Sequence, residues 1–421
     1  LIRCMTTGSP ASKISNPEPF VHLAGKKRMR GRITAAKHLQ TSIEDRSVTE
    51  ARSPASRKLN TLLDHFEKAG YGRREPKLLQ PARVFLDRSG ENFRGRLYLT
   101  NDPSGMELCL RPEYTIPICL EYLAQLAPKT AAYSYGGSIF RAPENASFKE
   151  GEFIQAGIES FGRLDREAAD AEILAVALES AKATGAKNLK VRIGDASLVA
   201  AFLDELNLPS VWRRRVIAGH ARGLSLKSIF EPVSVINPNV EQSGVRAALS
   251  RVDPADARQL VEDLLSIASI TAIGGRSAAE IAERFLDQAT LTSGEGLPSE
   301  KRTLLEAFFA IEDTPDEASN ALRRLAREAN LNLSEILDSF DTRTGFIAAH
   351  ELIIEEMIFS TSFARQLDYY TGFLFEAHEP DTKEPIIGGG RYDHLLQTLG
   401  ATQNVPAVGA AIWVDRLRSA T

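Results

Sequence analysis

Hydrophobic residues recur along the chain with two spacings, one typical of helices and one typical of strands. Around residue 60, apolar side chains lie three or four positions apart, at Leu59, Leu62, Leu63 and Phe66. This spacing predicts an amphipathic helix over residues 55–69, which Gly70 ends. We expect the folded part of the chain to begin with this helix.

Strands are predicted where apolar residues alternate with polar ones or form short runs. The predicted strands cover residues 84–86, 96–100, 131–140, 152–161, 189–193, 356–364, 373–378 and 408–414. Two further helices are predicted between them. An apolar helix covers residues 110–124 and begins at Arg111-Pro112, and a long helix follows its cap residue Asp165 and ends at Gly185.

Between residues 196 and 345 the composition changes, and segments rich in Ala, Leu, Glu and Arg predict helices, for example at 260–267 and 304–311. Because strand patterns return afterwards, the last segment must rejoin the sheet that begins before residue 195. We therefore predict an α+β core formed by residues 51–195 and 346–421, with an antiparallel sheet flanked by helices. Residues 196–345 are predicted to be a mostly helical insertion.

Composition excludes several classes of protein. The 51 basic and 55 acidic residues give a net charge of -4, whereas a nucleic-acid-binding protein usually has a basic excess. No run of 18 or more apolar residues is present, so no membrane span is expected. The cysteines, Cys4, Cys109 and Cys119, form no CxxC pair and predict reduced thiols in the cytoplasm. No metal site and no cofactor are expected.

Residues 1–43 are strongly basic and contain a single acidic residue, Glu18. This composition resembles that of a transit peptide. The simpler interpretation is a poorly ordered basic extension over residues 1–50, or a start site placed too far upstream, since Met5 follows closely. We expect the simpler interpretation to hold.

Two groups of polar residues fall where an apolar core would be expected. Glu113 and Thr115 follow Pro112, which favours the start of a helix, so Glu113 lies near free backbone N–H groups. This group is either a capped helix or part of a binding site. Gln155 and Glu159 share one face of a predicted strand, which indicates either a polar ligand or a structural ion pair.

Two further groups lie in the last quarter of the chain. Residues 365–372 bring together Arg365, Tyr369 and Tyr370, a combination suited to the carboxylate and ring of an amino acid, although a structural turn is the alternative. Three consecutive glycines at 388–390 precede Tyr392 and allow a close approach of the backbone, although hairpin turns use the same residues.

In this order, the four groups resemble the class II catalytic domain of histidyl-tRNA synthetase, over residues 55–417. The resemblance implies a histidine pocket in an antiparallel sheet. Glu113, Thr115 and Gln155 would hold the α-ammonium group, and Arg365 would face the carboxylate. The remaining roles fall to Glu159 and Tyr370 at the imidazole nitrogens, and to Tyr369 and Tyr392 as walls.

The sequence departs from the synthetase pattern where ATP would bind. The motif Phe-Arg-x-Glu reads here Phe140-Arg141-Ala142-Pro143-Glu144, so Arg141 remains but the glutamate is displaced by one position. The motif Gly-x-Glu-Arg reads Trp413-Val414-Asp415-Arg416, so Arg416 remains but an indole replaces the glycine that leaves room for adenine. Tyr114 and Gln366 replace family glycines and are expected to crowd the pocket.

Only five residues follow Arg416, so no anticodon-binding domain is expected. With these departures the chain resembles the regulatory subunits of ATP phosphoribosyltransferase, which are noncatalytic and act in the first step of histidine biosynthesis. The resemblance implies a short catalytic subunit as partner, histidine as effector and a homodimer within a hetero-oligomer, without tRNA or membrane. The alternative is a truncated synthetase paralogue that adenylates an amino acid.

Overall fold

The computed structural model of the chain describes most of the region after residue 52. The described residues are 53–86, 95–125, 130–143, 151–221, 223–230, 297–365, 369–380 and 382–417, with short pieces at 263, 272–273 and 276–277. Contacts divide the chain into two units, Leu1–Ser53 and Pro54–Thr421. The expectations for residues 1–50, the helix at 260–267, Glu144 and Gln366 lie outside the described residues.

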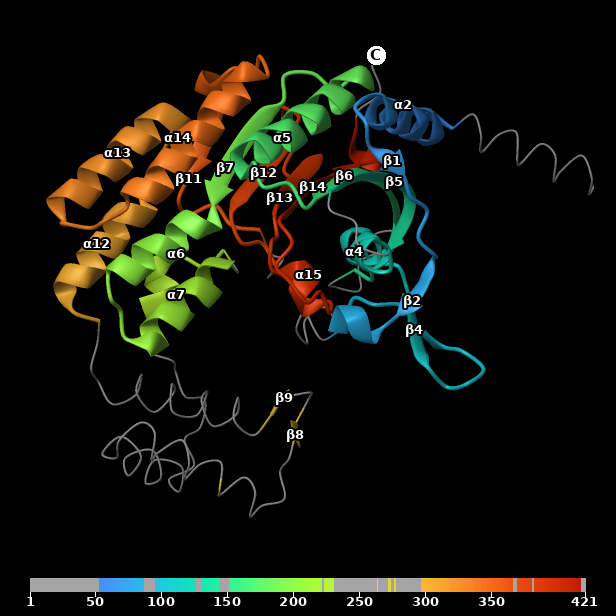
Figure 1. Cartoon of the computed structure of the whole chain (residues 1–421), viewed down its shortest axis with the longest axis horizontal. Coiled ribbons are helices and arrows are strands. Elements are labelled where there is room, and N and C mark those ends of the chain that lie inside the picture. Colours follow the sequence, from blue (N-terminus) through green and yellow to red (C-terminus); the bar gives the residue numbers. More distant parts are fainter. Residues whose placement is uncertain are drawn as a thin grey trace, which may run out of the picture. The chain divides into compact units, whose positions relative to one another are not determined.

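A nine-stranded sheet forms the centre of the second unit (Figure 1). Its strands in spatial order are β1 (Gly72–Arg73), β5 (Ala131–Phe140), β6 (Glu152–Phe161), β14 (Ala407–Trp413), β13 (Ile387–Arg391), β12 (Phe373–His378), β7 (Lys190–Asp195), β11 (Met357–Ser360) and β10 (Glu312–Asp313). Pairing is antiparallel from β5 to β7, as predicted, and a parallel pair flanks it on each side, β1–β5 and β7–β11. The last segment does rejoin the sheet, because β14 pairs with β6 and β12 pairs with β7.

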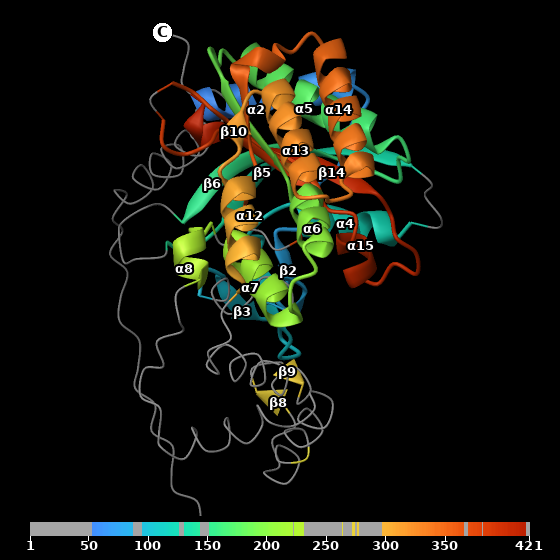
Figure 2. The ribbon, with the colours of Figure 1, turned by 90° about the vertical axis from the view of Figure 1, so that its left-hand side faces the viewer.

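Helices cover both faces of this sheet. They are α2 (Pro54–Lys68), α4 (Thr115–Leu123), α5 (Arg166–Ala183), α6 (Ala196–Glu205), α7 (Ser210–Ala221), α8 (Leu226–Phe230), α12 (Ser299–Phe309), α13 (Pro315–Glu328), α14 (Ser334–Ala349) and α15 (Leu395–Thr398), with 3₁₀ turns η1 (Ile354–Glu356) and η2 (Val414–Arg416). Helix α5 packs on β6, β14 and β13, with α2 and α14 beside it, while α4 and α15 lie on the other side of the sheet (Figure 1). Helix α13 lies against α14 (Figure 2).

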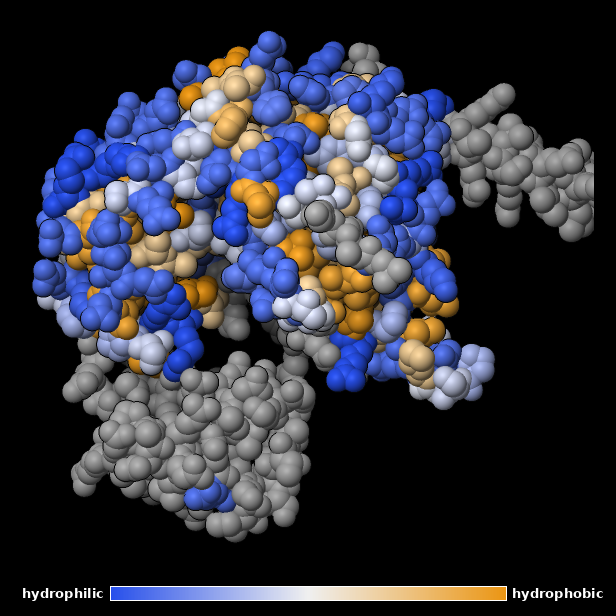
Figure 3. All heavy atoms as spheres, viewed as in Figure 1, coloured by the Kyte–Doolittle hydropathy of each residue, from blue (hydrophilic) through white to orange (hydrophobic). Residues whose placement is uncertain are grey.

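Two small sheets complete the fold. One has the strand order β2 (Leu79–Pro81), β4 (Glu107–Leu110) and β3 (Leu99–Asn101), and the other pairs β8 (Ala272–Ile273) with β9 (Arg276–Ser277). Large exposed apolar side chains gather on and next to the first of these: Leu78, Leu79, Tyr98, Leu99 and Met106. Figure 3 shows hydrophobic residues at this end of the visible face. None of the described helices is long and apolar enough to cross a membrane.

The alternation of side chains along β6 separates two hydrophobic cores. Ile154, Ala156 and Ile158 face the core beneath α2, α5 and α14, which is the larger one. Phe153 and Phe161 contribute to a second core that contains α4 and α15. Gln155 and Glu159 have the same parity as these phenylalanines, so the strand places two buried polar groups on the side of the second core. The predicted sharing of one face is confirmed.

Three local predictions are wrong. Residues 83–86 form a helical turn rather than a strand, because a short apolar run does not distinguish the two structures. The helix predicted over 110–124 begins only at Thr115, since Leu110 ends β4. The strand predicted over 356–364 ends at Ser360, where the chain turns.

Buried ion pairs join the described helices of the segment 196–345 to the rest of the unit. Arg343 of α14 bonds Asp195, whose other carboxylate oxygen caps α6. The same arginine also lies 3.6 Å from Asp170 of α5, which in turn pairs with Arg391 of β13 at 2.7 Å. Helices α6, α12, α13 and α14 contribute to the same core as α5. The division into core and insertion stays a prediction, and these contacts show that the described ends of the segment pack on the core.

Candidate functional site

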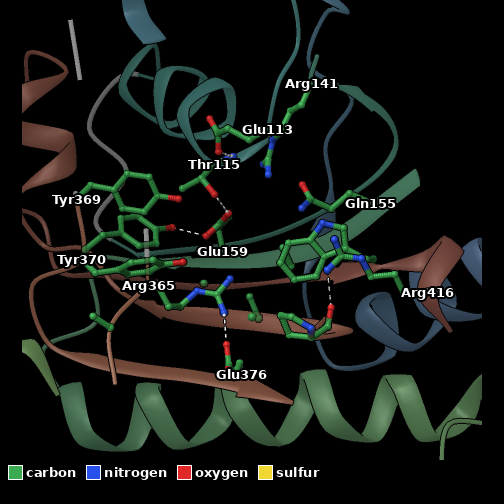
Figure 4. Close-up of a pocket in the computed structure, with 18 of the residues that line it drawn as sticks. Glu113, Thr115, Arg141, Gln155, Glu159, Arg365, Tyr369, Tyr370, Glu376 and Arg416 are labelled. Atoms are coloured by element: carbon green, nitrogen blue, oxygen red, sulfur yellow. Dashed lines mark hydrogen bonds and ion pairs between the residues drawn. The ribbon is translucent and has the colours of Figure 1, made fainter. Parts of the chain in front are cut away.

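A cavity of about 400 Å³ opens on the face of the sheet opposite α5 (Figure 4). Its volume is in the range of small-molecule sites. All ten site residues predicted from the sequence line it: Glu113, Thr115, Arg141, Gln155, Glu159, Arg365, Tyr369, Tyr370, Tyr392 and Arg416. They come from segments that are far apart in the chain, on α4, β5, β6, the stretch before β12, and the ends of β13 and β14. The fold therefore brings the four polar groups of the sequence into one cavity.

Glu159 lies at the bottom of the cavity with an exposed fraction of 1%. One carboxylate oxygen accepts hydrogen bonds from Thr115 Oγ1 at 2.8 Å and from Tyr135 OH at 3.2 Å, and the other accepts one from Tyr392 OH. Burial, opposed by these hydroxyls and assisted by the charge of Glu113, raises the pKa of Glu159 to about 8. The carboxyl group is therefore poised to exchange a proton near neutral pH.

Gly409 makes room for this carboxyl group. It lies directly opposite Glu159 in the β14–β6 register, and a Cβ atom there would overlap Glu159 Oε2 and come within 2.9 Å of the Ile158 carbonyl oxygen. The glycines at 388–390 lie within β13 rather than in a hairpin turn, and a Cβ at Gly388 would overlap the guanidinium of Arg365. A side chain at Gly388 would displace the Arg365 guanidinium, and one at Gly409 would also press on the backbone of β6.

Glu113 caps the helix that follows it, and its part in a binding site stays a prediction. Its two oxygens accept the backbone N–H groups of Thr115 at 2.7 Å and Ile116 at 2.8 Å, so it caps the first turn of α4. The same carboxyl group lines the cavity. Burial raises its pKa, while the backbone N–H groups and Arg141 act in the opposite direction.

Gln155 and Arg141 point into the cavity from neighbouring strands (Figure 4). Within the described residues, the Gln155 amide makes no hydrogen bond although its residue is only 3% exposed. Arg141 Nε donates to the Pro112 carbonyl at 2.7 Å, and burial lowers the pKa of its guanidinium. The structure shows no ion pair of Glu159 with a basic side chain on this face, and the Gln155 amide is open to the cavity among the described residues.

Arg365 approaches the cavity from the segment before β12. Its Nη1 donates to the Phe375 carbonyl at 3.3 Å and lies 3.8 Å from Glu376 Oε2, while its Nε has no hydrogen-bond partner among the described residues. Glu376 also lies 3.1 Å from His378 Nε2. The guanidinium is therefore held loosely and retains donors for an anionic group of a ligand.

Three tyrosines form an aromatic wall of the cavity. The rings of Tyr369 and Tyr370 lie 4.9 Å apart, and those of Tyr369 and Tyr392 lie 5.7 Å apart with an edge-to-face geometry. Burial raises the pKa of each phenol above its usual value. The phenols stay protonated at physiological pH and can donate hydrogen bonds.

The opposite end of the cavity is closed by Trp413 and Arg416. The Arg416 guanidinium stacks 4.7 Å from the centre of the indole, donates to the Pro385 carbonyl at 2.7 Å and pairs with Glu384 at 2.8 Å. These partners occupy an arginine that the synthetase family directs at phosphate. Trp413 lies in the cavity wall, and its occupation of the space of adenine stays a prediction.

The expected crowding of the cavity by Tyr114 is wrong. Tyr114 is buried against Tyr135, with ring centres 4.4 Å apart, and the Arg111 guanidinium covers its ring at 3.9 Å. It is absent from the residues that line the cavity. The packing of its neighbours directs the side chain of this N-cap residue away from the cavity. The replacement of a family glycine by tyrosine does not reveal this direction.

Sequence reasoning missed two charged residues of the cavity, Arg96 and Glu376. A signal for Glu376 was present, because it is a charged residue inside the otherwise apolar strand 373–377. The part of the chain that the structure describes contains no cluster of side chains able to hold a metal ion. Cys109 and Cys119 are free, buried thiols.

The sequence matches the model of the family "Histidyl-tRNA synthetase" over residues 42–222 and 257–417. It is 36% identical over 348 residues to an ATP phosphoribosyltransferase regulatory subunit of Brucella anthropi, covering 82% of this chain and 92% of that protein. A protein of the same name from Brucella canis is 35% identical over 350 residues, with the same coverage. The chain belongs to the ATP phosphoribosyltransferase regulatory subunits within the histidyl-tRNA synthetase family. The predicted family is therefore confirmed. The predicted role of the chain as a regulatory rather than a catalytic subunit is confirmed with it.

Solved structures support the fold of these regulatory subunits. A protein described as an ATP phosphoribosyltransferase regulatory subunit/histidyl-tRNA synthetase from Bacillus halodurans C aligns with a TM-score of 0.60 and 19% identity, covering 86% of this chain and 78% of that one. Histidyl-tRNA synthetase from Nostoc sp. PCC 7120 aligns with a TM-score of 0.56 and 17% identity, covering 86% and 70%. The predicted class II synthetase-like α+β fold is confirmed.

Proposed function

We propose that the chain binds histidine in this cavity, activates the short catalytic subunit of ATP phosphoribosyltransferase and makes it sensitive to inhibition by histidine. The observation that carries the proposal is that one cavity contains hydrogen-bonding groups without partners together with charged groups that complement an amino acid. Among the described residues, Arg365 Nε and the Gln155 amide have no hydrogen-bond partner, and the buried carboxyl groups of Glu113 and Glu159 line the same cavity. An amino acid supplies a counterpart to each of these groups.

The orientation of the ligand follows from the charges. The α-carboxylate would lie at Arg365, because within the described part of the chain its Nε has no partner and its Nη1 is held only by the Phe375 carbonyl at 3.3 Å and by Glu376 at 3.8 Å. The α-ammonium group would lie between Glu113, Thr115 and Gln155, where acceptors converge at the start of α4. The imidazole would lie along the tyrosine wall, with Glu159 and Tyr370 at its two nitrogens.

Regulation requires that histidine bind two states of the assembly with different affinities. If the inhibited assembly binds histidine more tightly than the active one, occupancy shifts the equilibrium toward inhibition. A coupling of about 1–3 kcal/mol corresponds to a change of about 5- to 150-fold in affinity, which suffices for feedback control. We further propose that the chain works in the cytoplasm as a homodimer within a hetero-oligomer, without tRNA or membrane.

The test is the activity of the short catalytic subunit with and without this chain, across a titration of histidine. We expect the chain to raise the activity and histidine then to suppress it, because binding in the cavity is linked to the state of the assembly. If the two proteins migrate separately and the activity does not change, the proposal fails.

The pH dependence of stability follows from Glu159. Its pKa is about 8 in the folded chain and near 4.5 in the unfolded chain, so between these values the folded state holds a proton that the unfolded state lacks. The stabilisation is complete below pH 4.5 and is lost as the pH rises through 8. We expect the free energy of unfolding to fall more steeply from pH 5 to 8.5 in the wild type than in Glu159→Gln, measured by urea denaturation. The exposed Glu306→Gln on α12 serves as control, and identical slopes for all three proteins would contradict the prediction.

A truncated amino-acid-adenylating enzyme is the second candidate, because Arg141, Arg365 and Arg416 all line the cavity. The pairing of Arg416 with Glu384 and its stacking on Trp413 argue against it. We expect no histidine-dependent exchange of pyrophosphate into ATP, since the positions of adenine and of a phosphate-binding arginine are occupied. Exchange above the level of a buffer control would favour this second function.

A further inference from the structure

A short segment of the chain connects the proposed histidine pocket to helices outside it. This segment, Ser360–Arg365, runs from the end of β11 to the arginine that lines the cavity, and we name it the anchor segment. Thr361, at its start, is 1% exposed. Its hydroxyl donates to the Phe308 carbonyl at 2.6 Å, and its N–H donates to the Ile311 carbonyl at 3.1 Å. Both acceptors lie at the end of α12, so the anchor segment is fixed to this helix.

A second helix holds the same residue from another direction. His220 of α7 contacts the Thr361 carbonyl through its Nε2 at 3.0 Å. A carbonyl oxygen only accepts, so this nitrogen carries the proton. Thr361 thus uses its hydroxyl, its N–H and its carbonyl to bond α12 and α7. Four residues further on, Arg365 faces the ligand cavity.

The anchor segment also separates two cavities. A second cavity of about 610 Å³ is lined by Ser362, Phe363 and Ala364 together with residues of α7, α8 and α12. Ala364 lines both this cavity and the candidate histidine pocket, whereas Thr361 and Phe363 are buried. The anchor segment therefore has open space on two sides next to Arg365, and its buried part is close-packed, so that a displacement there is passed to the neighbouring atoms.

We infer that the anchor segment transmits histidine occupancy from Arg365 to α7 and α12, with Thr361 as the positioning residue. The inference rests on the proposed binding of histidine in the cavity and adds the route by which that binding reaches another part of the molecule. A carboxylate bound by Arg365 pulls the end of the anchor segment toward the cavity. Thr361 and its three hydrogen bonds carry this displacement to the two helices.

The test is hydrogen–deuterium exchange of the full chain with and without saturating histidine, read by mass spectrometry in separate peptides. We expect histidine to slow exchange in β6 and β14, which line the cavity, and also in residues 210–221 and 299–311, which do not. In Thr361→Val, which keeps the shape of the side chain and loses its hydroxyl, the slowing in 299–311 should be lost while that in β6 and β14 remains. Thr344→Val is the matched control, because the Thr344 hydroxyl is also buried but bonds within α14.

The outcomes separate the inference from the proposed function. Slower exchange in β6 and β14 alone, with no change in α7 and α12 of the wild type, overturns the inference and leaves the histidine site intact. No change in any peptide overturns the proposed function. The comparison in the wild type decides both even if Thr361→Val fails to fold. Gly194→Ala gives a second variant: its Cβ would lie 2.9 Å from the Phe363 ring and press on the anchor segment outside the cavity, so histidine binding should weaken severalfold.

Discussion

Replacement of Arg365 by alanine is expected to abolish the response to histidine while the assembly with the catalytic subunit remains intact. The guanidinium lines the cavity, its Nε has no hydrogen-bond partner among the described residues, and in our proposal it binds the histidine carboxylate. A hydrogen bond to a charged group contributes about 1.5–3 kcal/mol, so the Kd for histidine should rise about 10- to 150-fold. Calorimetry on the isolated chain and inhibition of the mixed complex measure the two effects.

Two variants serve as controls for this experiment. Arg323→Ala on α13 removes a partly exposed arginine that pairs with Asp338 and Asp341 outside the cavity, and it should leave histidine binding unchanged. Arg365→Lys keeps the charge but loses the planar pair of donors, so an intermediate affinity is expected. Loss of assembly in Arg365→Ala would mean that the residue is structural. Unchanged affinity in a folded Arg365→Ala would exclude it from the carboxylate site.

Replacement of Gly409 by alanine is expected to destabilise the fold and to remove histidine binding together. The added Cβ overlaps the Glu159 carboxyl group, which three hydroxyls hold in place, and it approaches the Ile158 carbonyl oxygen at 2.9 Å. Overpacking of this kind costs about 1–3 kcal/mol. Urea denaturation should show this loss in the free energy of unfolding, and calorimetry should show no heat with histidine.

Gly345→Ala is the matched control, because a Cβ at this position of α14 meets nothing within 4 Å. Since alanine is favoured over glycine inside a helix by about 0.5–1 kcal/mol, this control should become more stable while Gly409→Ala becomes less stable. Histidine binding by the control should equal that of the wild type. Equal behaviour of the two variants would show that the space beside Glu159 is not restricted.

The pattern of polar residues predicted the members of the cavity, but not how each is used. Glu113 could be either a helix cap or a ligand-binding group from its sequence, and the structure shows that it caps α4 while lining the cavity. Arg416 was identified as a remnant of a phosphate site, whereas its pairing with Glu384 depends on where residues 384–385 lie. The sequence gives the identity of each side chain. It does not say which donors and acceptors of that side chain are already bonded to neighbouring residues.

The sequence by itself determined the strands 131–140, 152–161 and 373–378, whose predicted bounds coincide with β5, β6 and β12. It also determined that Gln155 and Glu159 share a face, because alternation is a property of neighbouring residues. Only the tertiary structure decided the strand order, the packing of the Tyr114 ring on Tyr135 and the hydrogen bonds of Thr361 to two helices. These features join residues that are far apart in the chain, such as Glu159 and Tyr392, and a local pattern carries no information on which distant groups meet.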